Sequence, residues 1–321
     1  MNLLKGLLRK QKCSFDVRLD WFVTMACNLR CDYCTLEKNT VVDKKHFETM
    51  CSNLIRVIDK TNKIFKINIT GGEPFIVPSI IDTLEEITKK HFISLNTNLS
   101  LDRIKEFAKR IDVNKVSFIN ASLHIKELEK RGLLNTYIEN FCLLRDRCFN
   151  INFSVVSFPP LANEASHYLQ FFNEKGIRIN FVPFLGQYNG KEYPNAYTKQ
   201  ELERFKIQLP RLSYYFRKGK ICNAGYNFAF CWEDGNITPC LYKNMKKIGT
   251  VDTRIELRDD LMVCPYDMCG CPIWAYEPVL LMKSLLKTGR STYLIYYILY
   301  SKAKNFYLKI IDLLRKAKKW I

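Results

Sequence analysis

Three cysteines near the start of the chain have a spacing that suits an iron–sulfur cluster. Cys27, Cys31 and Cys34 fall within eight residues, directly after the apolar run Trp21-Phe22-Val23. Three thiolates on one short loop can bind three irons of a [4Fe–4S] cube and leave the fourth iron without a protein ligand. An open iron can bind another molecule, so the pattern predicts catalysis. The alternative is a structural zinc site, although such sites usually supply four closed ligands.

A second motif, Gly71-Gly72-Glu73-Pro74, follows the strand-like segment Lys66–Thr70 about forty residues after the cysteines. Together the two motifs resemble the radical S-adenosylmethionine (radical SAM) superfamily. The resemblance implies that the open iron binds the methionine end of S-adenosylmethionine (SAM). Reductive cleavage of SAM would release a 5′-deoxyadenosyl radical that abstracts hydrogen from a substrate. The glycines would let the backbone approach SAM closely, and the Glu73 carboxylate would accept hydrogen bonds from its ammonium group.

The resemblance also predicts further contacts to SAM, made by residues that follow the expected strands. Tyr33 and Val182 would lie against the adenine. Asn98 falls where the family often has a Thr-Asn-Gly turn, although Leu99 replaces the glycine here. The remaining candidates are Ser122 for the ribose or carboxylate, Ser154 or Ser157 on the fifth strand, and His124, which either faces substrate or is a helix-capping or core histidine.

Alternating strand and helix patterns place these motifs in an α/β fold. Strands are predicted at 17–24, 66–70, 91–96, 116–123, 150–157 and 177–183, and helices at about 43–59, 79–90, 101–111, 125–147 and 162–175. Six such alternations predict βαβ units and a parallel sheet. The resemblance implies a partial (β/α)6 barrel of radical SAM type. Both motifs directly follow strands, and in parallel α/β folds the chemistry lies at the carboxyl ends of the strands.

The pattern changes after the sixth strand. Residues 184–197 are predicted to be a connector, 198–208 a helix with a Thr198–Glu201 capping box, and 228–240 a β-hairpin. The predicted domains are a basic amphipathic segment at 1–16, a radical SAM core at 17–197, an auxiliary-cluster extension at 198–276 and a basic amphipathic helical tail at 277–321.

A second group of cysteines lies in the predicted extension. The spacing Cys222-x12-Gly235-x4-Cys240 resembles the opening of SPASM and twitch extensions, which carry auxiliary [4Fe–4S] clusters. The later cysteines depart from the full SPASM pattern, which favours a twitch-like form with one cluster. The resemblance implies ligation by Cys222, Cys240, Cys269 and Cys271, with Cys264 or Cys231 as substitutes. Four cysteines would also suit a closed zinc site.

Composition and charge set the surroundings of this chemistry. Thirteen cysteines without a secretory signal indicate metal or redox use in a reducing cytoplasm. The net charge of +18 is concentrated at the ends, and residues 283–321 hold ten Lys/Arg and one acid. The tail suits an anionic membrane surface, a partner groove or packing on its own barrel, which predicts a cytoplasmic protein able to bind peripherally to a membrane. Nucleic acid is not expected, because no recognition motif accompanies the charge.

Three functions follow from these patterns. The first is hydrogen abstraction from a small polyol or sugar, which the tail suggests could be lipid-linked. The second is modification of a peptide or protein. The third is a non-catalytic iron–sulfur electron carrier, which the two complete motifs disfavour. Either enzyme would need an electron donor such as flavodoxin or ferredoxin.

Overall fold

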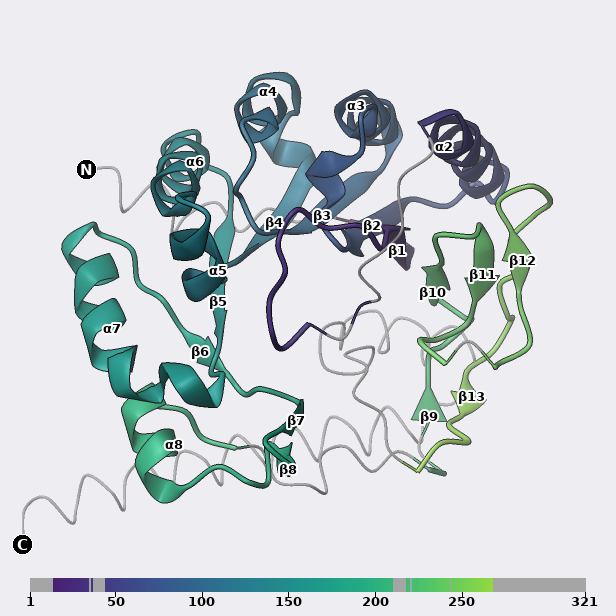
Figure 1. Ribbon diagram of the computed structural model, residues 1–321. Helices are drawn as coiled ribbons and strands as arrows, with labels where there is room; N and C mark the ends of the chain where they lie inside the picture. Colours follow the sequence, from purple (N-terminus) through teal and green to yellow (C-terminus); the bar gives the residue numbers. More distant parts are fainter. Residues whose placement is uncertain are drawn as a thin grey trace, which may run out of the picture.

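The computed structural model describes residues 14–34, 36, 44–209, 218–219, 221–242 and 244–267. Within this part, nine strands form one curved sheet in the order β12-β11-β10-β1-β2-β3-β4-β5-β6. Neighbouring strands from β1 to β6 all run parallel. The predicted α/β fold with a parallel sheet is therefore confirmed, and its curvature is that of an open part-barrel (Figure 1).

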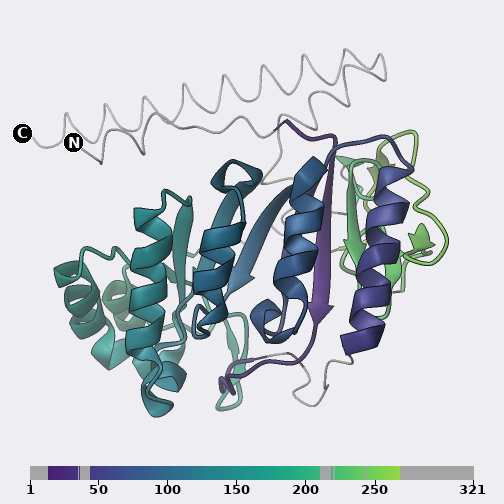
Figure 2. The same cartoon turned by 90° about the horizontal axis from the view of Figure 1, so that it is seen from above.

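Strands and helices alternate along the barrel. The strands are β1 (Val17–Thr24), β2 (Phe65–Gly71), β3 (Phe92–Thr97), β4 (Val116–Ser122), β5 (Ile151–Val156) and β6 (Phe181–Val182). The helices are α2 (Lys44–Asp59), α3 (Ile80–Lys90), α4 (Arg103–Arg110), α5 (Ile125–Lys130), α6 (Leu134–Asp146) and α7 (Ala165–Glu174), with short 3-10 turns η1 (Pro74–Ile76), η2 (Val113–Lys115) and η3 (Pro159–Glu164). Helices α2, α3, α4 and α6 cover the convex face of the sheet (Figures 1 and 2).

Apolar and polar residues tend to alternate along the strands, which gives the sheet an apolar face and a polar face. Leu19, Ile67, Leu95 and Ile119 are buried in the main core, together with apolar residues of the covering helices such as Leu54. Because successive strand residues point to opposite faces, the residues between them face the hollow of the barrel. Many of these are polar, which leaves a hydrophilic concave face.

The hairpin in the predicted extension forms and joins this sheet. It consists of β10 (Phe228–Cys231) and β11 (Asn236–Thr238), which pair antiparallel. Strand β10 then pairs parallel with β1, with Arg18 opposite Phe228 and Trp21 opposite Cys231. Strand β12 (Gly249–Thr250) extends the same edge, and β9 (Ile221–Cys222) pairs with β13 (Met262–Val263) in a separate ribbon. The extension thus continues the barrel sheet beyond its first strand.

Two local predictions were wrong in detail. The sixth strand is two residues long instead of seven, whereas the helical segments predicted at 125–147 are present as α5 and α6. The connector 184–197 contains a second hairpin, β7 (Gly186–Tyr188) and β8 (Lys191–Tyr193), which was missed. Its turn, Asn189-Gly190, has positive φ at both residues, and Asn-Gly is the sequence signal for such a turn. Helix α8 (Lys199–Phe205) has the predicted Thr198–Glu201 capping box.

Several predictions lie outside the described residues. These are the basic segment up to residue 13, the tail from residue 277, and the cysteines at positions 269 and 271. Among the residues that the structure does describe, no helix combines the length and hydropathy needed to span a bilayer.

Candidate active site

The cysteine loop directly follows β1 and runs across the edge where the parallel strands end (Figures 1 and 2). Cys31 is buried, Cys27 is half-buried and Cys34 is exposed. A hydrogen bond of 3.1 Å from the Cys34 amide to the Cys31 carbonyl closes a turn in the loop. The loop is anchored to α5 because the Arg30 amide donates to Oε1 of Glu127 at 2.9 Å. The Glu127 carboxylate is therefore one of the distant groups that fix the path of the loop.

The chemistry of the three thiols suits a cationic cluster. Burial and the neighbouring sulfurs of Cys27 and Cys34 raise the pKa of Cys31 to about 12. Burial also raises the pKa of Cys27, and the neighbouring Cys34 sulfur adds to this rise. Thiolates in this loop would thus need positive charge beside them, which bound iron supplies. Among the residues described, no three His, Cys, Asp or Glu side chains are arranged to hold a single metal ion.

The Gly-Gly-Glu-Pro turn packs directly against the backbone of the cysteine loop. The Gly72 amide donates to the Thr24 carbonyl at 2.7 Å, and the Glu73 amide to the Ala26 carbonyl at 2.9 Å. A Cβ on Gly71 would lie 2.2 Å from the Thr24 oxygen, and one on Gly72 would lie 1.9 Å from the Ala26 oxygen. The glycines therefore allow close approach of two protein loops, a contact that the sequence-based argument about SAM did not include.

Glu73, the third residue of this turn, is buried and is 1% exposed. Its carboxylate accepts hydrogen bonds from the Phe75 amide at 3.1 Å, Thr97 Oγ1 at 2.9 Å and the Asn98 amide at 2.7 Å. Burial raises the pKa of Glu73 to about 7, although these three donors favour its ionised form. The carboxylate thus ties the ends of β2 and β3 together.

The turn after β3 keeps its shape without the family's glycine. Leu99 has φ +51° and is fully buried. Its amide donates a hydrogen bond to Thr97 Oγ1 at 3.1 Å, and its carbonyl accepts one from Asn140 Nδ2 at 2.8 Å. Asn98, just before it, points at the cysteine loop, with Nδ2 at 2.9 Å from Oδ1 of Asn28.

Tyr33 and His124 contact each other at the carboxyl end of β4. The Tyr33 hydroxyl lies 2.8 Å from Nδ1 of His124. Burial lowers the pKa of His124 to about 4, so the imidazole is neutral near pH 7. His124 occupies the N-cap position of α5 but makes no side-chain cap hydrogen bond. Tyr33 also packs on Phe158 and Phe184, with ring centroids 5.1 and 6.5 Å apart.

A row of polar side chains crosses the concave face, and we call Asn68, Asn96 and Asn120 the asparagine row. Asn96 Nδ2 donates to Asn68 Oδ1 at 3.3 Å, and Asn120 Nδ2 donates to Asn96 Oδ1 at 3.1 Å. Ser154 Oγ continues the row by donating to Asn120 Oδ1 at 3.1 Å. Ser122 lies 3.5 Å from Asn120 Nδ2. Two predicted SAM contacts, Ser122 and Ser154, thus lie at the end of this row.

The other candidates on the later strands differ in exposure. Val182 is 38% exposed, whereas Ser157 is fully buried. Ser157 Oγ donates to the Val182 carbonyl at 2.8 Å and lies 2.8 Å from the Tyr197 hydroxyl. Its hydroxyl is therefore part of the fold, which leaves Ser154 as the accessible serine of the predicted pair.

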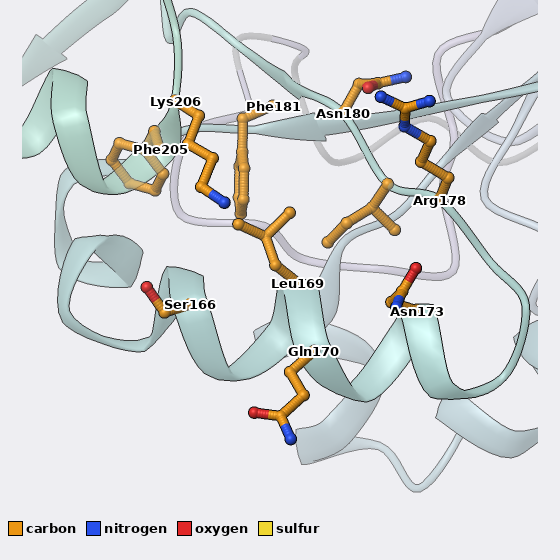
Figure 3. Close-up of a pocket in the computed structure, with 10 residues that line it drawn as sticks. Ser166, Leu169, Gln170, Asn173, Arg178, Asn180, Phe181, Phe205 and Lys206 are labelled. Atoms are coloured by element: carbon orange, nitrogen blue, oxygen red, sulfur yellow. The ribbon is translucent and has the colours of Figure 1, made fainter.

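A cavity of about 340 Å³ adjoins the cysteine loop. Cys31 and Tyr33 form one wall, and Leu123, Val156 and Phe158 from the ends of β4 and β5 form another. A larger cavity of about 620 Å³ lies elsewhere, between α7, β6 and the end of α8 (Figure 3). It is lined by none of the residues singled out from the sequence, and its polar residues, such as Arg178 and Asn173, are exposed.

The second cysteine group divides between the two faces of β10. Cys231 is fully buried in the main core, and burial raises the pKa of its thiol. Cys240 instead belongs to a separate cluster with Phe228 and Trp232, against which Cys222 packs. Cys231 is therefore wrong as a substitute ligand, because it points away from Cys240 and Cys222.

Cys264 lies on the same side as the remaining pair. Met262, two residues before it, is the direct β-ladder partner of Cys222, so Cys222 and Cys264 share a face of the ribbon. Cys240 and Cys264 both raise the pKa of Tyr266, although burial is the largest cause. Cys240 and Cys264 thus lie near Tyr266, and Cys222 packs against the same hydrophobic cluster as Tyr266.

Comparison with known proteins agrees with this geometry. Residues 21–156 match the model of the radical SAM superfamily, and this stretch runs from β1 to the end of β5. Over this stretch the chain is similar to the radical SAM superfamily. The similarity indicates an enzyme that uses a [4Fe–4S] cluster and SAM, and the cysteine loop and the Gly-Gly-Glu-Pro turn both fall inside the matched stretch.

Similar sequences include enzymes with different substrates. A GTP 3′,8-cyclase from Alkaliphilus oremlandii is 25% identical over 69% of this chain and 80% of its own length. The subtilosin biosynthesis protein AlbA from Bacillus subtilis is 22% identical over 71% of this chain. The chain spans 56% of AlbA and 65% of the GTP 3′,8-cyclase from Staphylococcus carnosus.

Solved structures show the same fold. The structure of anSMEcpe with bound AdoMet superposes with a TM-score of 0.53 at 17% identity, covering 73% of this chain and 78% of that one. The complex of anSMEcpe with AdoMet and the Cp18Cys peptide gives a TM-score of 0.51 at 18% identity, with 73% and 77% covered.

Proposed function

We propose that this radical SAM enzyme abstracts a hydrogen atom from a peptide bound against the polar concave face of its sheet. The observation that carries the proposal is the asparagine row, which lies in the hollow of the barrel below the cysteine loop. Side-chain amides both donate and accept hydrogen bonds, as the peptide groups of a substrate do. The row is therefore matched to a substrate with many amides.

The residues around the row have complementary roles in this proposal. Cys27, Cys31 and Cys34 hold the cluster, and SAM bound to it supplies the 5′-deoxyadenosyl radical as the hydrogen-abstracting group. Ser122 and Ser154 bind the ribose or carboxylate of SAM with their hydroxyls. Glu73 fixes the two turns that border the cysteine loop, and Asn98 holds that loop from the other side.

Aromatic side chains border one side of the hollow. Phe158 contacts Tyr188, with ring centroids 4.7 Å apart, and Phe184 contacts Phe158 at 5.3 Å. Together with Tyr33 they form a wall that can pack on apolar side chains of a peptide. Neutral His124, bonded to Tyr33, is placed to exchange a hydrogen bond with a substrate group beside this wall.

The names of the relatives favour a peptide over a polyol. AlbA takes part in bacteriocin biosynthesis, and anSMEcpe has been solved with a bound peptide. These relatives do not support the polyol or sugar substrate that was the first function expected from the sequence. The GTP 3′,8-cyclases make a nucleotide the competing substrate class.

An auxiliary cluster completes the proposal. Cys222, Cys240 and Cys264 gather on one face, and we assign them to the cluster with a cysteine from positions 269 and 271, in a twitch-like extension. Such a cluster could accept an electron from the substrate radical, with a flavodoxin or ferredoxin reducing the first cluster. This oxidative chemistry would take place in the cytoplasm, with the basic termini available to an anionic membrane.

The test uses anaerobically reconstituted enzyme, SAM, dithionite and synthetic copies of the small peptides encoded beside the gene. A peptide substrate carrying deuterium at its carbon-bound positions should transfer deuterium into 5′-deoxyadenosine, measured by mass spectrometry. GTP and simple polyols serve as competing substrates in parallel reactions. The proposal would be contradicted if GTP or a polyol transferred deuterium and none of the peptides did.

The asparagine row provides a matched pair of variants. Asn120→Leu removes the last amide of the row at similar volume and should lower peptide-dependent turnover at least tenfold, about 1.4 kcal/mol in transition-state binding. Its iron content should not change. Asn173→Leu alters an exposed residue of α7 (Figure 3) and should leave turnover unaltered.

A further inference from the structure

A closed ring of hydrogen bonds joins the cysteine loop to the turn after β3. Asn28 Nδ2 donates to Ser100 Oγ at 2.8 Å, and Ser100 Oγ donates to Asn98 Oδ1 at 2.6 Å. Asn98 Nδ2 donates to Asn28 Oδ1 at 2.9 Å and closes the ring. Asn98 and Ser100 are each 3% exposed, so water scarcely competes for these bonds.

The ring fixes which end of the Asn98 amide faces Cys27. The backbone amide of Ser100 donates to Oδ1 of Asn98 at 3.0 Å, and a backbone amide can only donate. Nδ2 must therefore occupy the other end, where it lies 3.9 Å from Cys27 Sγ. One of its two hydrogens goes to Asn28, and the other is directed to the sulfur. The Leu29 amide is a second donor to the same sulfur at 3.4 Å.

We propose that Asn98 donates a hydrogen bond to the Cys27 thiolate in the loaded enzyme and raises the reduction potential of the first cluster. The inference rests on the proposed role of Cys27 as a cluster ligand. Reduction adds one electron to the cluster, and part of the added negative charge resides on its sulfurs. A donor to a ligand sulfur stabilises the reduced form more than the oxidised form, so it shifts the potential upward.

Asn98 is thus a positioning and tuning residue that acts through Cys27. Its backbone amide is held by Glu73 at 2.7 Å, so the Gly-Gly-Glu-Pro turn sets where the side-chain amide points. Three segments that are far apart in the sequence, around Asn28, Glu73 and Asn98, are therefore joined by hydrogen bonds next to the Cys27 sulfur.

The test measures the midpoint potential by EPR-monitored redox titration of the SAM-free reconstituted enzyme, with dithionite as reductant. The relevant signal is the one that disappears when Cys27, Cys31 and Cys34 are all changed to Ala. Asn98→Leu removes the donor at similar volume, and Asn98→Asp keeps the acceptor for the Ser100 amide but removes the donor. Asn98→Leu should lower the midpoint potential by about 59 mV, which corresponds to a tenfold smaller reduction equilibrium constant for one electron. Asn98→Asp should lower it at least as far, because its carboxylate also brings negative charge next to the cluster.

Asn140→Leu is the structural control. Asn140 is fully buried and holds the same turn through the carbonyls of Leu99 and Leu101, at 2.8 and 3.0 Å. This variant should lower stability and leave the potential unchanged. Unaltered potentials in both Asn98 variants, an equal shift in Asn140→Leu, or loss of iron from both Asn98 variants would overturn the tuning role. A wild type with no signal that depends on the three cysteines would instead refute the proposed function.

Discussion

Replacing Gly72 by Ala tests how the two motifs hold each other. The added Cβ would lie 1.9 Å from the Ala26 oxygen, 2.5 Å from the Ala26 carbonyl carbon and 2.8 Å from the Met25 oxygen. All three atoms belong to the backbone that leads into Cys27, so no side-chain rotation relieves the clash. Gly72 is not among the glycines with positive φ, which makes the perturbation steric.

The magnitude follows from the contacts that must change. Overpacking against fixed atoms costs about 1–3 kcal/mol. Moving the turn away weakens the bonds from the Gly72 and Glu73 amides to Thr24 and Ala26, worth about 1 kcal/mol each. The expected loss is about 3–5 kcal/mol, a large share of a total stability of about 5–15 kcal/mol.

The assay is iron per chain after anaerobic reconstitution, together with the urea midpoint of unfolding. Gly72→Ala should bind less iron at the first cluster and unfold at lower urea. Gly132→Ala is the control, because its Cβ meets nothing within 4 Å although its φ is +67°. It should cost about 1–2 kcal/mol and keep its iron. Wild-type iron content and urea midpoint in Gly72→Ala would refute the packing argument.

Three further predictions concern buried groups. The pKa of Glu73 is raised from 4.5 to about 7 in the folded chain. The folded state therefore binds more protons than the unfolded state between these values, and stability should fall as pH rises through them. Glu73→Gln should remove this pH dependence, and equal slopes of melting temperature against pH in both proteins, between about pH 5 and pH 8, would contradict the prediction. Cys240→Ala should remove the auxiliary cluster, about four irons, whereas Cys231→Ala should keep all iron and lose only stability; iron loss in Cys231→Ala would reverse that assignment. Tyr33→Phe leaves the Nδ1 of His124 without its hydroxyl partner and should cost about 1–3 kcal/mol in urea unfolding, and an unchanged urea midpoint would show that the bond is not formed.

Sequence patterns were sufficient for the catalytic edge of the fold. The strand before Cys27 and the strand before Gly71 were recognisable from apolar residues, and parallel topology then placed both motifs at the same edge. Periodicity also located the helices that cover the sheet. These features depend on local residue order, which is what a single sequence records.

Long-range pairing was not accessible in the same way. Nothing in Phe228–Cys231 indicates that this strand pairs with β1, since the two are separated by about two hundred residues. The ring of Asn28, Asn98 and Ser100 likewise joins residues about seventy positions apart. Polar side chains of this kind show no periodicity, so their convergence on Cys27 emerges only from the folded chain. The separation of Cys231 from Cys240 could have been suspected, because strand residues alternate between faces.

The measurement that tests the central claim most directly is anaerobic iron and sulfide analysis with SAM cleavage, on wild type and on a variant with Cys27, Cys31 and Cys34 changed to Ala. The wild type should hold about eight irons per chain and release 5′-deoxyadenosine from SAM with dithionite. The variant should hold about four irons and release none. Equal iron in both proteins, or zinc in place of iron in the wild type, would contradict a catalytic cluster on this loop.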